Sequence, residues 1–453
     1  MGRITLRQAA QWCGGRVEEK YADVTFYGAS NDTRTLQPGQ LFVALKALRD
    51  GHDFVPAAFV KGAAAVLCSR VDGDYPAIIV EDTRIALGNI ARHERQRLGV
   101  KVVGITGSVG KSTTKEMIAC VLDGSFTISK TPANHNNDIG MPIAVLAMPE
   151  STEVAVLEMG MNHFREIAYL ATIAKPDVAV IINIGTMHIE HLGSQEGILR
   201  AKLEILEGME PDGKVLLNGD DRLLWNYGKT APVPITYFGA NNGECGVRAV
   251  RVEEKDGSLS MEVEHKDGQF GLTLPLEGKH YVSDALAAVA VGLAMGVAPE
   301  LIAERLGSFR NMEGRQEIFS VNERTIIKDC YNAGPESMAA ALAVLGNRAG
   351  RRIAVLGDML ELGSSTQAEH YRVGRLAAEK AQLVLAFGPN ADRVVSGALT
   401  GGMHPSNARA FTDRETLADF LKQISRPGDV ILFKGSHGMK MELILEQFLR
   451  EDR

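Results

Sequence analysis

The sequence has few cysteines, only two tryptophans and no excess of positive charge among its 453 residues. Its five cysteines are dispersed, odd in number and without C-x-x-C or metal-finger spacing, which argues against a disulfide framework. We therefore expect reduced thiols in a cytoplasmic protein. The formal net charge of −7 disfavours nucleic acid or an anionic membrane as the main partner.

Long hydrophobic runs are also missing. No apolar stretch approaches the roughly 18 residues needed to span a bilayer. The N-terminus lacks the apolar core of a signal peptide, and Leu6 stands where a myristoylation motif needs Ser or Thr. We expect no membrane insertion. The hydrophobic content of 45% and the length predict ordinary globular material, enough for about three domains.

Short apolar runs alternate with helical patterns along most of the chain, as in α/β proteins. The strand candidates are residues 25–27, 40–45, 64–68, 77–80, 102–105, 154–157, 178–184, 214–217, 325–328, 353–356, 383–387 and 430–433. Helices are predicted at residues 84–97, 194–209, 282–295 and 299–306, and an antiparallel patch at 249–276.

This pattern predicts three α/β domains. Residues 1–83 form a small N-terminal unit, residues 84–312 a central unit with a doubly wound, mostly parallel sheet, and residues 313–453 a Rossmann-like C-terminal unit.

A glycine-rich turn follows the apolar run at 102–105 and opens a helix. It reads Thr106, Gly107, Ser108, Val109, Gly110, Lys111, Ser112, Thr113. Such a P-loop lets backbone N–H groups surround phosphate oxygens, while Lys111 neutralises the outer phosphates and Ser112 ligates Mg²⁺. Ile105 stands where the common G-x-x-x-x-G-K-[ST] form has glycine, so this is the shorter Thr-Gly-x-x-Gly-Lys-Ser form. The motif predicts a nucleoside triphosphate site.

Polar residues follow the neighbouring strand candidates, where open α/β sheets bind ligands. Glu158 could give a carboxylate to Mg²⁺ opposite Ser112, or could merely cap the next helix. His188 and His191 suggest zinc, but no third ligand of suitable spacing is visible, so a histidine near magnesium is preferred. By pattern alone Lys202 is a solvated helix lysine.

Several blocks together resemble the Mur ligase family: residues 106–113, 136–142, 158–160 and His188. Three more blocks, at 329–333, 357–363 and 434–436, resemble the branch of that family that adds D-Ala-D-Ala. With residues 30–54 included, the resemblance extends over all three predicted domains.

The resemblance implies an ATP-dependent amide ligase that completes the cytoplasmic peptidoglycan precursor. A carboxylate of UDP-MurNAc-tripeptide would attack the γ-phosphate to give an acyl phosphate, and the amine of D-Ala-D-Ala would then displace phosphate. Because two anions must meet, Lys111, Arg315 and Mg²⁺ would offset their repulsion. No dimerisation signature is apparent, so a monomer is expected.

The resemblance also implies roles for single residues. Ser112 and Glu158 would hold one Mg²⁺ and His188 a second, and Lys202 falls on the lysine that this family carries as a carbamate, a further Mg²⁺ ligand. The catalytic residues would be Lys111, His188, Lys202 and Arg315. Nucleotide contacts would come from residues 106–113 with Asp284, Arg315 and Asp329. Substrate contacts would come from Ser30, Asp32, Thr33, Arg34, Asp50, His52, Asn136, Asn137, Tyr331, Asn332 and Asp358.

The chain departs from the family pattern at several positions. Tyr281 and Asp284 stand where asparagines are usual. Because Asp284 as a carboxylate can only accept hydrogen bonds, it could take either the adenine amino group or a guanine edge. The other departures are Glu313, Cys330, His437 and a shortened loop at residues 46–49.

The nearest alternative function is another Mur-type or folylpolyglutamate-type amide ligase, against which the block at 357–363 argues. A P-loop kinase or nucleotide-gated binding module would leave Glu158, His188 and Lys202 without a joint purpose. The sequence leaves open whether the third residue of the tripeptide is meso-diaminopimelate or lysine.

Overall fold

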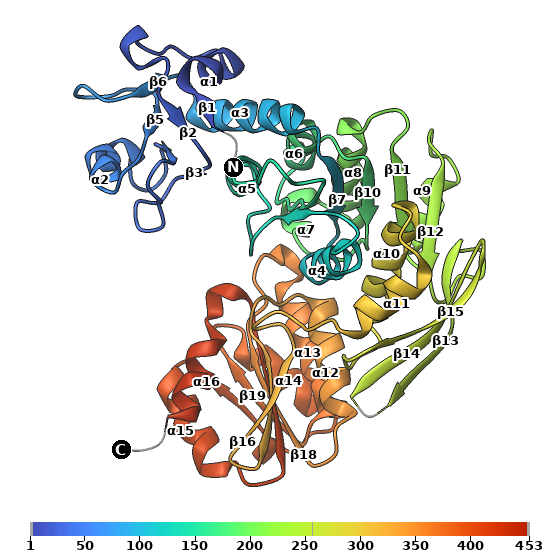
Figure 1. Ribbon diagram of the computed structural model, residues 1–453. Helices are drawn as coiled ribbons and strands as arrows, with labels where there is room; N and C mark the ends of the chain where they lie inside the picture. The colour runs from blue at the N-terminus through green and yellow to red at the C-terminus, as the bar shows by residue number, and fades with distance from the viewer. Residues whose placement is uncertain (1–2, 256, 451–453) are drawn as a thin grey trace.

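The computed structural model describes residues 3–255 and 257–450, and it has the predicted α/β architecture with three sheet-containing lobes (Figure 1). None of the described helices is long and apolar enough to cross a membrane.

The N-terminal lobe contains a four-stranded parallel sheet in the order β3-β4-β5-β6. Its strands are β3 Ala29–Ser30, β4 Leu41–Val43, β5 Ala65–Cys68 and β6 Ala77–Ile79. A separate antiparallel pair, β1 Ile4–Thr5 with β2 Thr25–Phe26, and the helices α1 Leu6–Cys13 and α2 Val55–Val60 complete the lobe. The predicted strands therefore form, each somewhat shorter than its apolar run.

Helix α3, Thr83–Leu98, links this lobe to the centre of the molecule (Figure 1). It begins at Asp82, whose side chain accepts hydrogen bonds from two backbone N–H groups, and it ends at Gly99 in the left-handed conformation. It packs against α1 on one side and against α5 Gly140–Leu146 and α6 Glu166–Ala174 on the other. The rings of Trp12 and His93 stack across the α1–α3 contact, 5.7 Å apart.

The central lobe contains a nine-stranded sheet in the order β15-β14-β13-β12-β11-β10-β7-β9-β8. Its strands are β7 Lys101–Thr106, β8 Ile128–Lys130, β9 Val154–Glu158, β10 Val178–Ile181, β11 Lys214–Asn218, β12 Ile235–Gly239, β13 Val247–Lys255, β14 Ser258–His265 and β15 Gly268–Leu274. Strands β7 to β13 are parallel, and the predicted antiparallel patch is confirmed as β13 to β15.

The helices of this lobe are α4 Lys111–Leu122, α5, α6, α7 Ile189–Leu192, α8 Gln195–Leu203, α9 Arg222–Gly228, α10 Tyr281–Ala294 and α11 Pro299–Gly307. The helix expected over residues 194–209 is shorter than predicted and continues as a 3₁₀ turn, Glu204–Gly208. Where the α-helix gives way to the 3₁₀ turn, the buried carboxylate of Glu204 accepts hydrogen bonds from the N–H groups of Arg165 and Ala168, at the start of α6.

The C-terminal lobe contains a six-stranded sheet in the order β16-β17-β21-β18-β19-β20, parallel except for β16. Its strands are β16 Glu317–Val321, β17 Arg324–Asp329, β18 Arg351–Gly357, β19 Leu383–Phe387, β20 Ala408–Phe411 and β21 Asp429–Lys434. Its helices are α12 Pro335–Gly346, α13 Thr366–Lys380, α14 Ala391–Thr400, α15 Arg414–Ile424 and α16 Met441–Leu449. Separate apolar clusters on the two faces of the sheet form the core of this lobe.

Candidate functional site

The turn between β7 and α4 has the geometry of a phosphate-binding loop. Gly110 has a φ of +83°, a left-handed conformation that favours glycine, and it is the N-cap of α4. The Lys111 side chain turns back over the loop, and its Nζ donates to the carbonyl oxygens of Gly107 (2.9 Å) and Ser108 (3.3 Å). Burial lowers the pKa of Lys111. The helix N-terminus and this ammonium group make the loop suited to anions.

Ser112 contacts two other predicted site residues from distant parts of the chain, Glu158 and Arg315. Its hydroxyl donates to Glu158 Oε2 at the end of β9 (2.8 Å), and Arg315 Nη2 donates to the same hydroxyl oxygen (2.8 Å). Asn136 Nδ2 donates to the other oxygen of Glu158 (2.9 Å). The P-loop, the β9 carboxylate and an arginine of the C-terminal lobe therefore form one constellation.

The Ser112 and Glu158 oxygens fit a magnesium ion. With Mg–O bonds of about 2.0–2.1 Å, neighbouring ligands in an octahedron lie about 2.9 Å apart, and these two oxygens are 2.8 Å apart. Within the described residues, no group of three or more His, Cys, Asp or Glu side chains is arranged to hold a metal. A Mg²⁺ ion shared with phosphates needs only one or two such oxygen ligands from the protein, a number that Ser112 and Glu158 could supply.

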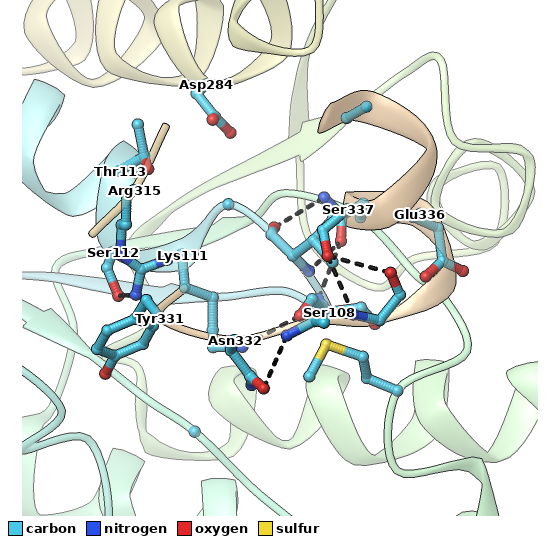
Figure 2. Close-up of a pocket in the computed structure, with 18 of the residues that line it drawn as sticks. Ser108, Lys111, Ser112, Thr113, Asp284, Arg315, Tyr331, Asn332, Glu336 and Ser337 are labelled. Carbon is cyan, nitrogen blue, oxygen red and sulfur yellow. Dashed lines mark hydrogen bonds between the residues drawn. The ribbon is translucent and has the colours of Figure 1, made fainter. Parts of the chain in front are cut away.

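A cavity of about 530 Å³ opens beside the P-loop and is lined by residues of the central and C-terminal lobes (Figure 2). Predicted residues that line it are Ser108, Val109, Gly110, Lys111, Ser112, Thr113, Asn136, Asn137, Glu158, His188, Asp284, Arg315, Asp329, Tyr331 and Asn332. Most of the expected nucleotide and metal residues thus share one cavity, large enough for a small ligand.

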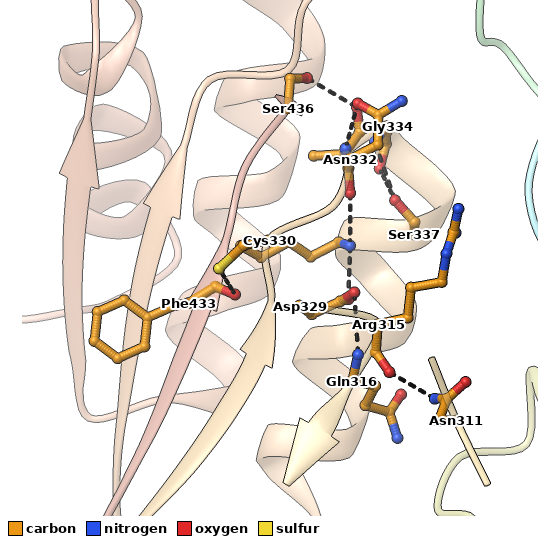
Figure 3. Close-up of polar contacts among 12 residues, drawn as sticks. Asn311, Arg315, Gln316, Asp329, Cys330, Asn332, Gly334, Ser337, Phe433 and Ser436 are labelled. Carbon is orange, nitrogen blue, oxygen red and sulfur yellow. Dashed lines mark hydrogen bonds and ion pairs between the residues drawn. The ribbon is translucent and has the colours of Figure 1, made fainter. Parts of the chain in front are cut away.

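The C-terminal lobe presents a polar network to this cavity (Figure 3). The Arg315 guanidinium stacks on the Tyr331 ring at 3.9 Å. Asp329 accepts a hydrogen bond from the buried ammonium of Lys434 (2.6 Å), which also donates to the Asn332 carbonyl oxygen (3.0 Å). The network thus orders Arg315 and Asp329 at the cavity that the phosphate loop also lines.

The two unusual residues at the start of α10 are both buried. Asp284 accepts a hydrogen bond from the Thr114 hydroxyl (3.0 Å) and lies against Gly110, and burial raises its pKa to about 7. The Tyr281 hydroxyl accepts a hydrogen bond from Asn311 Nδ2 (2.6 Å), and burial raises the pKa of this phenol. Asp284 therefore lies next to the phosphate loop.

Among the other departures, Glu313 pairs with Lys328, and Cys330 is buried, which raises the pKa of its thiol to about 12. The His437 ring lies 5.9 Å from that of Tyr331.

Lys202 and His188 occupy different surroundings. Lys202 is 2% exposed, and burial together with the charge of Lys111 lowers its pKa well below the usual value. Across residues 3–255 and 257–450, its ammonium group has no hydrogen-bond or ion-pair partner. His188 lines the cavity with a φ of +63°, and its Nδ1 lies 2.9 Å from Glu361 Oε2.

The sequence pattern does not single out Asn183. Its Oδ1 accepts hydrogen bonds from the N–H groups of Ser108 (2.9 Å) and Val109 (3.0 Å), and its Nδ2 donates to the Val109 carbonyl oxygen (2.9 Å). The feature of the sequence that could have identified Asn183 is its place as a polar residue near the end of an apolar run. The run 178–184 predicts a strand throughout, whereas β10 ends at Ile181 and places Asn183 in the following loop.

Two groups of predicted substrate residues lie outside the cavity. The first, Ser30, Asp32, Thr33, Arg34, Asp50 and His52, belongs to the N-terminal lobe. There the Arg34 guanidinium pairs with Asp32, and Asp50 pairs with His52 and Arg70. The second is Asp358, which is 2% exposed and accepts hydrogen bonds from Asn390.

A P-loop sheet that faces a second α/β lobe across a cavity is the arrangement of a nucleotide-binding protein, and here Ser112 and Glu158 of one lobe meet Arg315 of the other. The chain belongs to the Mur ligase family: residues 105–292 match its middle domain and residues 314–437 its glutamate ligase domain.

Relatives that are similar over nearly their whole length share one name, UDP-N-acetylmuramoyl-tripeptide--D-alanyl-D-alanine ligase. The Bacillus subtilis protein is 38% identical, with 99% of each chain covered, and the Escherichia coli protein 35% identical, with 98% of this chain and 97% of the relative covered.

Solved structures agree with this similarity. MurF from Acinetobacter baumannii matches with a TM-score of 0.92 and 31% identity over all of both chains. MurF ligase from Thermotoga maritima, solved in complex with ADP, matches with a TM-score of 0.83 and 29% identity over 93% of this chain and 97% of that one.

Proposed function

We propose that this chain is an ATP-dependent ligase that forms the amide bond between UDP-N-acetylmuramoyl tripeptide and D-Ala-D-Ala. The relatives named above carry this activity in their names, and one of the similar structures holds ADP. The observation that carries the proposal is the meeting of Ser112, Glu158 and Arg315, from two lobes, at one P-loop.

In the proposed reaction, a tripeptide carboxylate oxygen bonds to the γ-phosphorus and ADP leaves. Lys111 exchanges the carbonyl oxygens of Gly107 and Ser108 for phosphate oxygens, and Arg315 neutralises the charge that develops on the transferred group. The D-Ala-D-Ala amine then attacks the acyl carbon and gives up a proton, and phosphate leaves from the tetrahedral intermediate. Mg²⁺, held by Ser112 and Glu158 with a second ion near His188, would add Lewis-acid charge at the phosphates.

Lys202 fits the proposed carbamate. Its lowered pKa favours the neutral amine, which is the form that bonds to CO₂, losing a proton and gaining a carboxylate-like group. A buried ammonium without a partner is unfavourable, so the surroundings of Lys202 disfavour an unmodified cation. The modified side chain would then serve as a magnesium ligand.

The three predicted domains divide this work in our proposal. Residues 1–83 would bind the uridine nucleotide through the loops of Asp32 and Asp50, residues 84–312 would bind ATP, and residues 313–453 would complete the nucleotide site and receive D-Ala-D-Ala near Asp358. The monomeric state and cytoplasmic location stay predictions.

The test is phosphate release measured with each substrate omitted in turn. We expect ADP and phosphate only when ATP, the UDP-linked tripeptide and D-Ala-D-Ala are all present, with one dipeptide incorporated for each phosphate. Steady ADP formation without D-Ala-D-Ala, or no incorporation of the dipeptide, would contradict the proposal.

A further inference from the structure

The loop that follows β10, residues 182–188, shapes the phosphate loop from one side. Besides the hydrogen bonds of Asn183, the Gly185 N–H donates to the Ser108 hydroxyl oxygen (2.9 Å). Four hydrogen bonds that involve a side chain, and one between backbone groups, thus join this loop to Ser108 and Val109. A displacement of residues 182–188 will therefore also displace the phosphate loop.

The C-terminal lobe holds the same loop through Glu336, on the first turn of α12 (Figure 2). Glu336 Oε1 accepts two hydrogen bonds from Thr186, from its N–H and from its hydroxyl, each 3.0 Å long. The approach is close, because a Cβ on Gly185 would lie only 3.0 Å from that oxygen. The Glu336 carboxylate of the C-terminal lobe is thus hydrogen-bonded to both the backbone and the side chain of Thr186 in the central lobe.

The other oxygen of Glu336 is buried and, within the part of the chain that the structure describes, has no hydrogen-bond partner. An unpaired buried acceptor opposes stability, although the partial positive charge of the α12 N-terminus favours a carboxylate here. Stability alone is therefore a poor explanation for Glu336 at the lobe contact, and its position beside the cavity points to a role in the site.

We propose that Glu336 is a positioning residue that docks the C-terminal lobe on the loop supporting the phosphate loop. The inference rests on the proposed function, because that reaction needs Arg315 of one lobe against the phosphates held by the other. The hydrogen bonds from Thr186 to Glu336 stabilise the arrangement of the lobes in which Arg315 reaches Ser112. In this proposal Glu336 acts through Thr186 and not through the reacting atoms.

A second contact limits the expected effect. His188 Nδ1, two residues after Thr186, lies 2.9 Å from Glu361 Oε2 of the C-terminal lobe. Loss of the Glu336 contact should therefore loosen the docking without abolishing it.

The test compares Glu336→Ala and Glu336→Gln in steady-state kinetics and thermal unfolding. We expect Glu336→Ala to raise the KM for ATP about tenfold, less than the full loss of two hydrogen bonds to a charged acceptor, because the His188–Glu361 contact between the lobes remains. Glu336→Gln keeps an acceptor oxygen for Thr186 and should stay within about threefold of the parent. The matched control is Glu415→Ala, which removes an exposed carboxylate from the first turn of α15 in the same lobe, and it should change neither parameter.

Thr186→Val removes one of the two donors and completes a double-mutant cycle. We expect it to raise the KM for ATP in the parent and to have little further effect in Glu336→Ala. Three outcomes would overturn the proposal: Glu336→Ala within twofold of the parent, Glu336→Gln as impaired as Glu336→Ala, or fully additive effects. If Glu336→Ala does not fold, Thr186→Val and Glu336→Gln decide alone. A parent chain that never incorporates D-Ala-D-Ala contradicts the proposed function instead.

Discussion

Asp284 is a buried acid in contact with the phosphate loop, and its surroundings favour the protonated form. Desolvation raises its pKa to about 7, and the Thr114 hydroxyl compensates only in part. An acid whose pKa is raised on folding binds its proton more tightly in the folded state. Its contribution to stability is thus greatest below the ordinary pKa near 4 and is lost as pH rises toward about 7.

Replacement by asparagine removes this titration. We expect Asp284→Asn to stabilise the nucleotide-free protein more at pH 8 than at pH 5, by about 1–3 kcal/mol, since each unit of pKa shift corresponds to about 1.4 kcal/mol. Thermal unfolding between pH 5 and pH 8 measures the difference. An equal effect of the substitution at both pH values would show that Asp284 ionises normally.

Lys202 is the second buried titratable residue with a testable role. We expect Lys202→Ala to abolish ligation and added bicarbonate not to restore it, because the alanine side chain has no amine to form a carbamate. Lys202→Met keeps the buried volume and should fold equally well but remain inactive. Lys229→Ala, at an exposed lysine of the same lobe, is the control for turnover. Near-normal turnover of either Lys202 variant would refute the carbamate.

At the scale of elements, the β7–α4 turn shows which parts of the site the sequence could predict. The P-loop residues and Glu158 can be predicted from the local sequence. Each comes at the end of an apolar run, so spacing alone places them at the carboxyl edge of the sheet. Asn183 and Glu336 could not be found in this way. The first depends on where β10 ends, and the second on how α12 docks across the lobes.

Gly110 and Gly99 both lie at helix ends with a left-handed backbone conformation, so the effects of substituting them can be compared. Gly110 precedes α4, and a Cβ there would lie 2.5 Å from Asp284 Oδ1; a Cβ on Gly99, at the end of α3, would meet no atom of the described residues within 4 Å. We expect Gly99→Ala to cost about 1 kcal/mol of stability through backbone strain and to leave nucleotide binding intact.

Gly110→Ala adds a clash to the same strain, so it should abolish ADP binding measured by calorimetry. Binding of ADP by Gly110→Ala with the affinity of the parent would show that the loop relaxes without loss.

At the scale of the whole molecule, the site joins residues about 200 positions apart in the chain, Ser112 and Arg315. The sequence predicted the three sheets because each is built from its own run of apolar segments, and the family resemblance supplied Arg315. The contact of Arg315 with Ser112, and its stacking on Tyr331, depend on the docking of two lobes and follow from no local pattern.

This contact predicts that lysine cannot replace Arg315. Lysine lacks the planar guanidinium that stacks on Tyr331 while donating to Ser112. We expect Arg315→Lys to lower kcat about 100-fold, typical for removal of one group that stabilises developing charge. Arg310→Lys, at an exposed arginine that precedes Arg315 in the chain, is the control. A kcat for Arg315→Lys within a few-fold of the parent would exclude a role in the chemical step.

The stack of Trp12 on His93 has a further consequence. It lies at the joint where α1 of the N-terminal lobe meets α3, and the chain has one other tryptophan, Trp225, which packs on Tyr237 in the central lobe. Replacing Trp225 with phenylalanine would leave a single indole whose fluorescence depends on the imidazole beside it. In that variant, the fluorescence of Trp12 would report on the contact between α1 and α3. Binding of the UDP-linked substrate could then be followed in real time without an attached dye.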